Sequence, residues 1–272
     1  MNKYFNSNFI IRCITGFLYV IIILFSIEKG GKFFRIVMML LSFICLFEYL
    51  MICQTEMYLI KIVSFFFIIS ILIDLLIKKG LISYMICFIP YSTIFFIIQL
   101  FSKKYSHKEK IERVSRLIFG LVYIIIPFYL ANYIYDTAVY GKELILGTFI
   151  LVWINDSFSY LIGKKWGKRK IAISISPKKS IEGFIGGFFS CLILGFLLYN
   201  KWEEIYWIIL SFVIPFFATI GDLVESTIKR SFCVKNSGIF FPGHGGFLDR
   251  LDSFIFVMPI ITTIVASISY FF

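Results

Sequence analysis

The C-terminal part of this chain decides its fold, and it reads EIYWIILSFVIPFFATI (204–220), GDLVE (221–225), STIKRSFCVKNSGIFFPGHGGFLDRLD (226–252) and SFIFVMPIITTIVASISYFF (253–272). The first and last of these segments are almost purely apolar, whereas the third is dense in charge. Charged side chains are costly near hydrocarbon. A charged cluster between two membrane-type segments therefore indicates a functional site, and its acids, bases and glycines together suit a metal-bound phosphate.

The composition of the whole chain is that of a membrane protein. Its 272 residues are 60% hydrophobic and only 16% charged, and the mean hydropathy is +0.90. In soluble domains about a quarter of the residues are charged. Since a membrane-spanning helix needs about 20 apolar residues, the sequence predicts nine spans, at about 9–27, 33–53, 58–77, 81–101, 117–136, 143–163, 181–199, 204–221 and 253–271.

The predicted fold is thus all-α, a polytopic membrane helical bundle. We expect N-terminal transmembrane helices in residues 1–140, and C-terminal helices with the catalytic site in residues 141–272. The net charge of +11 comes from lysines and arginines in short loops, above all after the fourth, sixth and eighth spans. Such loops face the cytoplasm. This pattern predicts an N-in, C-out protein of the inner (plasma) membrane with its site facing the cytoplasm, and it does not suggest a nucleic-acid partner.

The eighth span runs directly into polar residues. If its helix continues, one face carries Asp222, Ser226, Lys229 and Arg230. The last three follow Asp222 by four, seven and eight positions, which is the spacing of one helix face. A salt-bridged helix end would be the ordinary explanation of such a stripe. It would not require Asp222 so close to hydrocarbon, so we favour a functional role.

A glycine-rich turn, FPGHGG (241–246), precedes the last helix. Glycines allow backbone N–H groups to approach an anion. Asp249 and Asp252 follow at the start of the helix and share a face, although acidic residues there are also ordinary helix caps. Asp222 lies at the end of one helix and Asp249 at the start of the next. Both can therefore lie at the same, cytoplasmic edge of the membrane. Two carboxylates with phosphate oxygens suit Mg²⁺.

Two further segments carry polar residues toward the same rim. The sixth span contains Asn155 and Asp156 in WINDSFSYLIGKKWGKRK (153–170), and the seventh opens with SPKKSIEGFIGG (176–187). An acid inside an apolar span indicates function. A GxxxG pair, Gly183 and Gly187, fits either packing within one chain or a homodimer face. Two more intramembrane acids, Glu48 and Asp74, have no accompanying motif and are assigned no role.

These motifs resemble the signature of the phosphatidate cytidylyltransferase (CDP-diacylglycerol synthase) family over roughly residues 150–260. The resemblance rests mainly on the spacing of Ser226, Ile228, Lys229, Arg230, Lys235, Gly238, Phe241, Pro242, His244, Gly245, Gly246, Phe247, Asp249, Arg250, Leu251 and Asp252. It is supported by Asp156-Ser157 with Tyr160 and Gly163, and by the segment 176–187. The chain departs from the family at Asn236, where the family has Asp, and an amide oxygen can ligate a cation but supplies no charge.

The resemblance implies phospholipid biosynthesis through the reaction CTP + phosphatidate → CDP-diacylglycerol + diphosphate. It implies Mg²⁺, with a second monovalent cation beside it, and metal ligation by Asp222 and Asp249. The catalytic residues that we expect are Lys229, Arg230, Lys235, His244, Asp249 and Asp252. The substrate-binding residues that we expect are Asp156, Lys164, Lys178, Lys179, Glu182, Ser226, Gly245, Gly246 and Arg250.

Other classes stay open at this point. A transporter for an anionic substrate would place its polar residues along a path through the midplane, frequently at broken helices, whereas here the charges collect at one rim. A CTP-dependent lipid kinase would transfer the γ-phosphate and release CDP. A membrane scaffold would have no need of the cluster.

Overall fold

The computed structural model describes residues 2–65, 69, 93–102, 104–235, 237–238 and 245–271. Residues 2–14 and 269–271 are described by their backbone alone. The chain forms two compact units. The first comprises Met1–Tyr133 with Asn236–Leu248, and the second comprises Ile134–Lys235 with Asp249–Phe272. The chain therefore leaves the second unit for the segment before the last helix and then returns to it.

The described residues of the first unit are mostly helical. Its helices are α1 (Asn2–Lys29), α2 (Gly31–Ile52), the helical stretches 57–65 and 93–101, α5 (His107–Gly120), the π-helical stretch η1 (Leu121–Ile125) and the first part of α6 (Ile126–Thr137). Within this unit α2 packs against α1, α5 and η1. Ser106 begins α5 with a capping box, in which Ser106 and Glu109 satisfy each other's backbone N–H groups.

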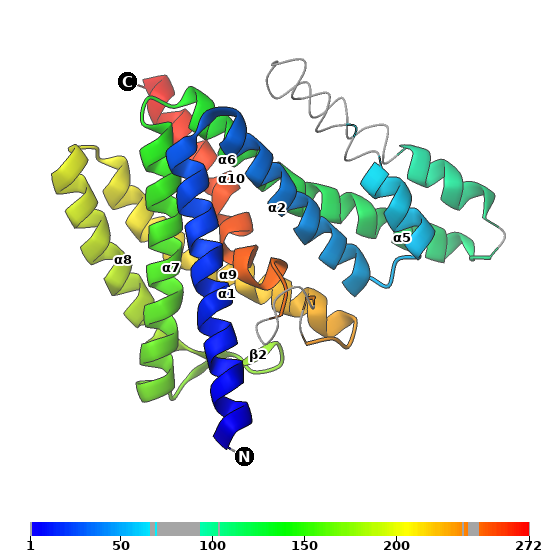
Figure 1. Ribbon diagram of the computed structural model, residues 1–272, viewed down its shortest axis with the longest axis horizontal. Helices are drawn as coiled ribbons and strands as arrows, with labels where there is room; N and C mark the ends of the chain where they lie inside the picture. The colour runs from blue at the N-terminus through cyan, green and yellow to red at the C-terminus, as the bar shows by residue number, and fades with distance from the viewer. Residues whose placement is uncertain are drawn as a thin grey trace. The chain divides into compact units, whose positions relative to one another are not determined.

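The second unit carries the helices that form the site. It contains the end of α6, α7 (Gly141–Trp166), the antiparallel strands β1 (Lys170–Ala172) and β2 (Ser176–Ser180), α8 (Ile181–Trp202), α9 (Tyr206–Ser231) and nearly all of α10 (Leu248–Phe271). Helix α8 packs along both α7 and α9 (Figure 1). The β1–β2 hairpin occupies the basic connection between the sixth and seventh predicted spans, which the sequence did not predict to form strands.

The all-α membrane fold is confirmed. Six helical segments of the described residues are long and apolar enough to cross a membrane, namely Gly31–Ile52, His107–Thr137, Gly141–Trp166, Ile181–Trp202, Tyr206–Ser231 and Leu248–Ile268. They correspond to six of the nine predicted spans. The first predicted span lies within α1, and the predicted spans 58–77 and 81–101 fall largely outside the described residues. The chain is thus a multi-pass membrane protein, whereas the number nine stays a prediction.

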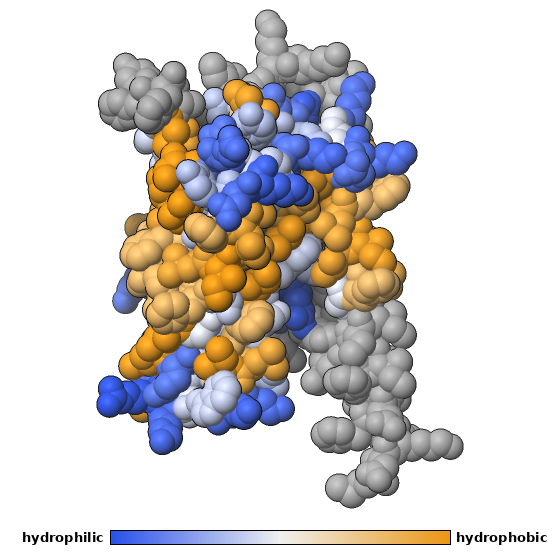
Figure 2. Space-filling view, turned by 90° about the vertical axis from the view of Figure 1, so that its left-hand side faces the viewer, coloured by the Kyte–Doolittle hydropathy of each residue, from blue (hydrophilic) through white to orange (hydrophobic). Residues whose placement is uncertain are grey.

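One face of the second unit is suited to contact lipid. Figure 2 shows a belt of hydrophobic side chains over α8, with hydrophilic side chains at both ends. The exposed residues along this helix include Ile185, Phe189, Ile193, Phe196 and Leu197. Apolar exposure on this scale is unusual for a soluble monomer, and it is what a helix in contact with acyl chains requires.

Small residues bring α7, α8 and α9 together. A Cβ added at Gly183 would lie 2.6 Å from the backbone oxygen of Ser159, and one added at Gly187 would lie 2.8 Å from that of Asn155. Both glycines of the GxxxG pair therefore pack on α7 of the same chain. Lipid supplies little hydrophobic drive for helix association, so close backbone contact of this kind holds membrane helices together.

Gly195 is expected to be essential to the contact between α8 and α9. An added Cβ would overlap the side chain of Ser211 and would lie 2.9 Å from the backbone oxygen of Trp207. We expect Gly195→Ala to lower the free energy of unfolding by roughly 1–3 kcal/mol, as overpacking does, measured by thermal unfolding in detergent micelles. The control is Gly16→Ala in α1, where an added Cβ meets nothing within 4 Å. Equal stability of the two variants would contradict this prediction.

Candidate active site

A cavity of about 700 Å³, lined by many charged side chains, lies within the second unit. Its lining residues come from α7, the hairpin, α8, α9 and the first turns of α10. Its ionisable members are the carboxylates Asp156, Asp222, Glu225, Asp249 and Asp252, and the cations Lys164, Lys170, Lys178, Lys179, Lys229 and Arg250. A cavity of this size suits a ligand as large as a nucleotide, and its mixture of both charges suits a metal-bound phosphate.

Helix α9 carries the first part of the site because it continues beyond its apolar stretch to Ser231. Lys229 and Arg230 lie in its last turn, where cations complement the helix dipole. The predicted polar face is confirmed at its centre, since Ser226 Oγ donates a hydrogen bond of 3.2 Å to Asp222 Oδ1. The uninterrupted helix is thus what places Asp222 and Lys229 on one wall of the cavity.

Lys229 joins α9 to α10. Its ammonium group forms ion pairs with Glu225, four residues earlier on α9, and with Asp249 in the first turn of α10. Only 11% of the Lys229 side chain and 1% of the Glu225 side chain are exposed. A buried charge is costly unless it is paired, so these three side chains depend on one another.

Three carboxylates converge on one point. Asp222, Glu225 and Asp252 each offer an oxygen, and these oxygens lie within 4.8 Å of one another. Gly221 explains how α10 comes so near, because a Cβ added there would lie 2.8 Å from the backbone oxygen of Asp252. The predicted metal pair was Asp222 and Asp249. Asp222 belongs to the observed group, whereas Asp249 bonds to Lys229 beside it.

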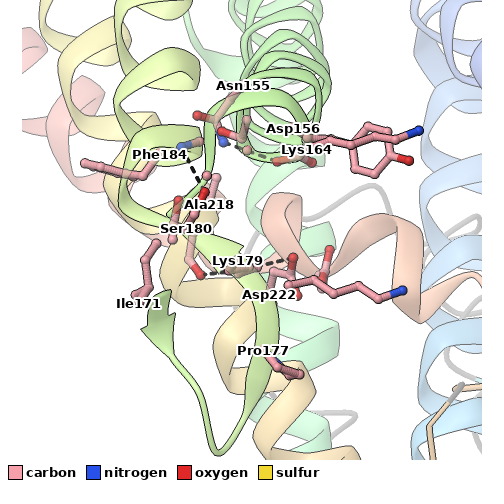
Figure 3. Close-up of a pocket in the computed structure, with 18 of the residues that line it drawn as sticks. Asn155, Asp156, Lys164, Ile171, Pro177, Lys179, Ser180, Phe184, Ala218 and Asp222 are labelled. Atoms are coloured by element: carbon pink, nitrogen blue, oxygen red, sulfur yellow. Dashed lines mark hydrogen bonds and ion pairs between the residues drawn. The ribbon is translucent and has the colours of Figure 1, made fainter. Parts of the chain in front are cut away.

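The hairpin brings a second lysine to this group. Ser180 begins α8 as its N-cap and accepts a hydrogen bond of 3.2 Å from the N–H of Gly183, which fixes the end of β2. Lys179, the preceding residue, then reaches Asp222 Oδ2 at 2.7 Å, as Figure 3 shows. The same ammonium group donates to the backbone oxygen of Thr219 at 3.3 Å. A lysine predicted to bind substrate thus lies against a carboxylate predicted to bind metal.

Helix α7 contributes the amide and acid predicted from the sixth span. Asn155 Nδ2 donates a hydrogen bond of 3.2 Å to Asp156 Oδ1. Both residues line the cavity near the hairpin and α8 (Figure 3). Among the described residues no partner satisfies Asn155 Oδ1 or Ser159 Oγ, although both atoms are buried. Both atoms lie close to Gly187, where α7 and α8 pack together.

The structure thus brings eight of the predicted site residues to the cavity in addition to the carboxylate Asp222: Asp156, Lys164, Lys178, Lys179, Lys229, Asp249, Arg250 and Asp252. Ser226 is not among the lining residues, but it donates a hydrogen bond to Asp222, which is. Arg230 extends away to the backbone oxygens of Ile175 and Val234, and Lys235 is exposed. Gly245 and Gly246 belong to the first unit. His244 and Asn236 fall outside the described residues.

Glu182 has a local role that the sequence did not reveal. Its carboxylate accepts hydrogen bonds from the backbone N–H groups of Lys168 (3.0 Å) and Arg169 (3.2 Å), and so fixes the connection into the hairpin. Its predicted role in substrate binding stays a prediction. Glu225, which lies beside Asp222, was assigned no role from the sequence, although an acid three residues after Asp222 lies on the same side of a continuing helix.

Comparison with known proteins identifies the relationship. The model of the cytidylyltransferase family matches residues 10–268. The chain belongs to this family. Among its relatives, a phosphatidate cytidylyltransferase of Staphylococcus saprophyticus is 33% identical over 276 residues, which cover 95% of this chain and 99% of the relative. That of Staphylococcus aureus (strain COL) is 36% identical over 259 residues, covering 92% and 96%. That of Staphylococcus epidermidis is 34% identical over 270 residues, again covering 92% and 96%.

Proposed function

We propose that this protein transfers the cytidylyl group of CTP to phosphatidate, giving CDP-diacylglycerol and diphosphate for phospholipid biosynthesis. The observation that carries the proposal is the cavity and its ion pairs. In it, lysines from the hairpin and α9 pair with carboxylates on α9 and α10. The names of its relatives support the choice of reaction.

The carboxylate group fits a magnesium ion. Asp222, Glu225 and Asp252 offer three oxygens within reach of one another, and two of these side chains are buried. Among the described residues, Glu225 Oε1 has no hydrogen-bond donor. Five carboxylates line the cavity. Within the group of Asp222, Glu225 and Asp252, Lys179 pairs with Asp222 and Lys229 pairs with Glu225. Mg²⁺ prefers oxygen ligands, so we propose that Asp222 holds it with these neighbours, and with Asp249 as the sequence predicts.

The nucleophile needs no protein base. The second pKa of a phosphate monoester lies near 6, so the lipid phosphate is already ionised at neutral pH. Its oxygen attacks the α-phosphorus of CTP, a new P–O bond forms, and the bond to the bridging oxygen breaks as diphosphate leaves. A bound Mg²⁺ would neutralise charge on the triphosphate. The chain's own part is to position the phosphates and to offset their charge with Lys178, Lys179 and Arg250.

The membrane setting follows from the substrates. CTP is soluble in water and phosphatidate is not, so the site must open at a water–lipid boundary. We propose the inner (plasma) membrane, with the cavity facing the cytoplasm as the basic loops predict. The predicted homodimer is likewise a proposal for which the GxxxG pair gives no support, because both of its glycines face α7.

A single assay separates the candidate functions. Purified protein in micelles receives phosphatidate, Mg²⁺ and CTP labelled in turn at the α- and γ-phosphate. We expect α-label in the lipid product and γ-label in diphosphate. γ-Label in the lipid would instead identify a kinase, and no chemistry with either label would favour a transporter. Repeating the assay in K⁺, Na⁺ and choline buffers tests the predicted second monovalent cation.

A further inference from the structure

Glu48 is a buried acid near the C-terminal end of the apolar helix α2, and the sequence assigned it no role. Only 1% of the residue is exposed. Its Oε1 accepts a hydrogen bond of 3.1 Å from the N–H of Phe247, and its Oε2 accepts one of 2.9 Å from the N–H of Leu248. Ser237 Oγ also donates to Oε2, at 3.3 Å. One carboxylate of the first unit thus holds residues from both ends of the segment that leads into α10.

Two glycines of the segment are shaped to this carboxylate. A Cβ added at Gly238 would overlap Glu48 Oε1 and would lie 2.7 Å from its Cδ. A Cβ added at Gly246 would overlap Oε2 and Ser237 Oγ. Both positions therefore exclude a side chain because the backbone approaches Glu48 closely. Gly245, with φ of 88°, adds a backbone conformation that glycine adopts without strain.

The bonds to Glu48 explain how an acid is accommodated inside an apolar helix. Burying a carboxylate is costly unless donors satisfy it, and charge-assisted hydrogen bonds are stronger than neutral ones. The N–H of Leu248 opens α10, where a negative charge is also stabilised by the helix dipole. The anion that these N–H groups hold is therefore the protein's own carboxylate.

We propose that Glu48 is the positioning residue of the active site, acting through the peptide that links Leu248 to Asp249. It fixes the first residue of α10, and the chain continues directly into Asp249, Arg250 and Asp252. This inference deepens the proposed function and rests on it. Glycines that the sequence assigned to cradling a substrate phosphate are needed, on this view, for the approach to Glu48.

The first test is Glu48→Gln, with Glu112→Gln on the exposed face of α5 as its control. Glutamine keeps the shape but turns an NH₂ group toward a backbone N–H donor. We expect kcat to fall about 10–100-fold, as for partners that orient metal ligands, with KM for CTP changed less than about threefold and the unfolding transition retained. A KM effect alone, or wild-type kcat, would overturn the proposal.

The second test is a double-mutant cycle, which isolates the contact itself. Gly238→Ala should lose activity in the wild-type background, because the nearest atoms that its methyl group meets all belong to Glu48. In the Glu48→Ala background the carboxylate is absent, so Gly238→Ala should lose little more. Fully additive losses would show that Gly238 acts independently of Glu48 and would overturn the inference.

Hydrogen exchange gives a readout that does not depend on the reaction. The amides of Phe247 and Leu248 should exchange at least about tenfold faster in Glu48→Gln and in Gly246→Ala, while α7 and α8 keep their protection. If wild-type protein forms no CDP-diacylglycerol, the proposed function fails, and this exchange result still decides whether Glu48 anchors the segment. Unchanged exchange at the two amides would refute the anchoring.

Discussion

Asp222→Asn is expected to reduce CTP-dependent formation of CDP-diacylglycerol by roughly 10³-fold, which is the scale of losing a preorganised electrostatic group at a reacting centre. Asp222 is the carboxylate common to the predicted metal pair and to the group with Glu225 and Asp252. It also pairs with Lys179 at 2.7 Å. The substitution removes the charge with almost no change in volume, so the protein should still insert and fold. Turnover is measured in micelles at saturating CTP.

Titration with Mg²⁺ then distinguishes which partner shares the ion with Asp222. If Asp252 is the partner, Asp252→Asn should raise the Mg²⁺ concentration for half-maximal rate, whereas Asp249→Asn should mainly disturb the ion pair with Lys229. The reverse pattern would support the pair predicted from the sequence. Glu203→Gln, at an exposed residue that ends α8, serves as the control. Normal turnover in Asp222→Asn would refute the metal proposal.

Lys229→Met is expected to lower both stability and activity. The substitution leaves Glu225 and Asp249 without the cation that pairs with both of them. Removing one partner of a buried ion pair costs about 3–5 kcal/mol, so the unfolding transition in micelles should shift to lower temperature by a corresponding amount. Activity should fall as well, because the two helices that carry the carboxylates lose the side chain that joins them.

A companion variant separates these two effects of Lys229. In Lys229→Met/Glu225→Gln the buried charge is removed together with its partner, so part of the stability should return while activity stays low. Lys201→Met in the last turn of α8 is the control, since that lysine is exposed and lies over the ring of Trp202. If Lys229→Met unfolds at the wild-type temperature, then Lys229 is not needed to compensate the buried acids.

The sequence by itself determined that the chain is a polytopic helical membrane protein, because apolar runs of membrane length leave the backbone little choice but helix. It also predicted many of the polar residues that line the cavity of the second unit. Acids such as Asp156 and Asp222 are costly next to hydrocarbon, and the motifs around them distinguished them from Glu48, which was assigned no role. The helical repeat was enough to predict that Asp222, Ser226 and Lys229 share one face, and the continuous α9 confirms this.

Only the tertiary structure decided which of those charges meet. Distances between Asp252, Asp249 and α9 depend on how closely α10 approaches at Gly221, and a linear pattern does not encode that approach. The same holds for Lys179, which reaches Asp222 only because the basic connection forms a hairpin capped by Ser180. Glu48 is the clearest case, since its hydrogen-bond partners lie about 190 to 200 positions away along the chain. Local periodicity extends over a few turns of helix, whereas a buried carboxylate is satisfied by whichever donors the fold brings to it.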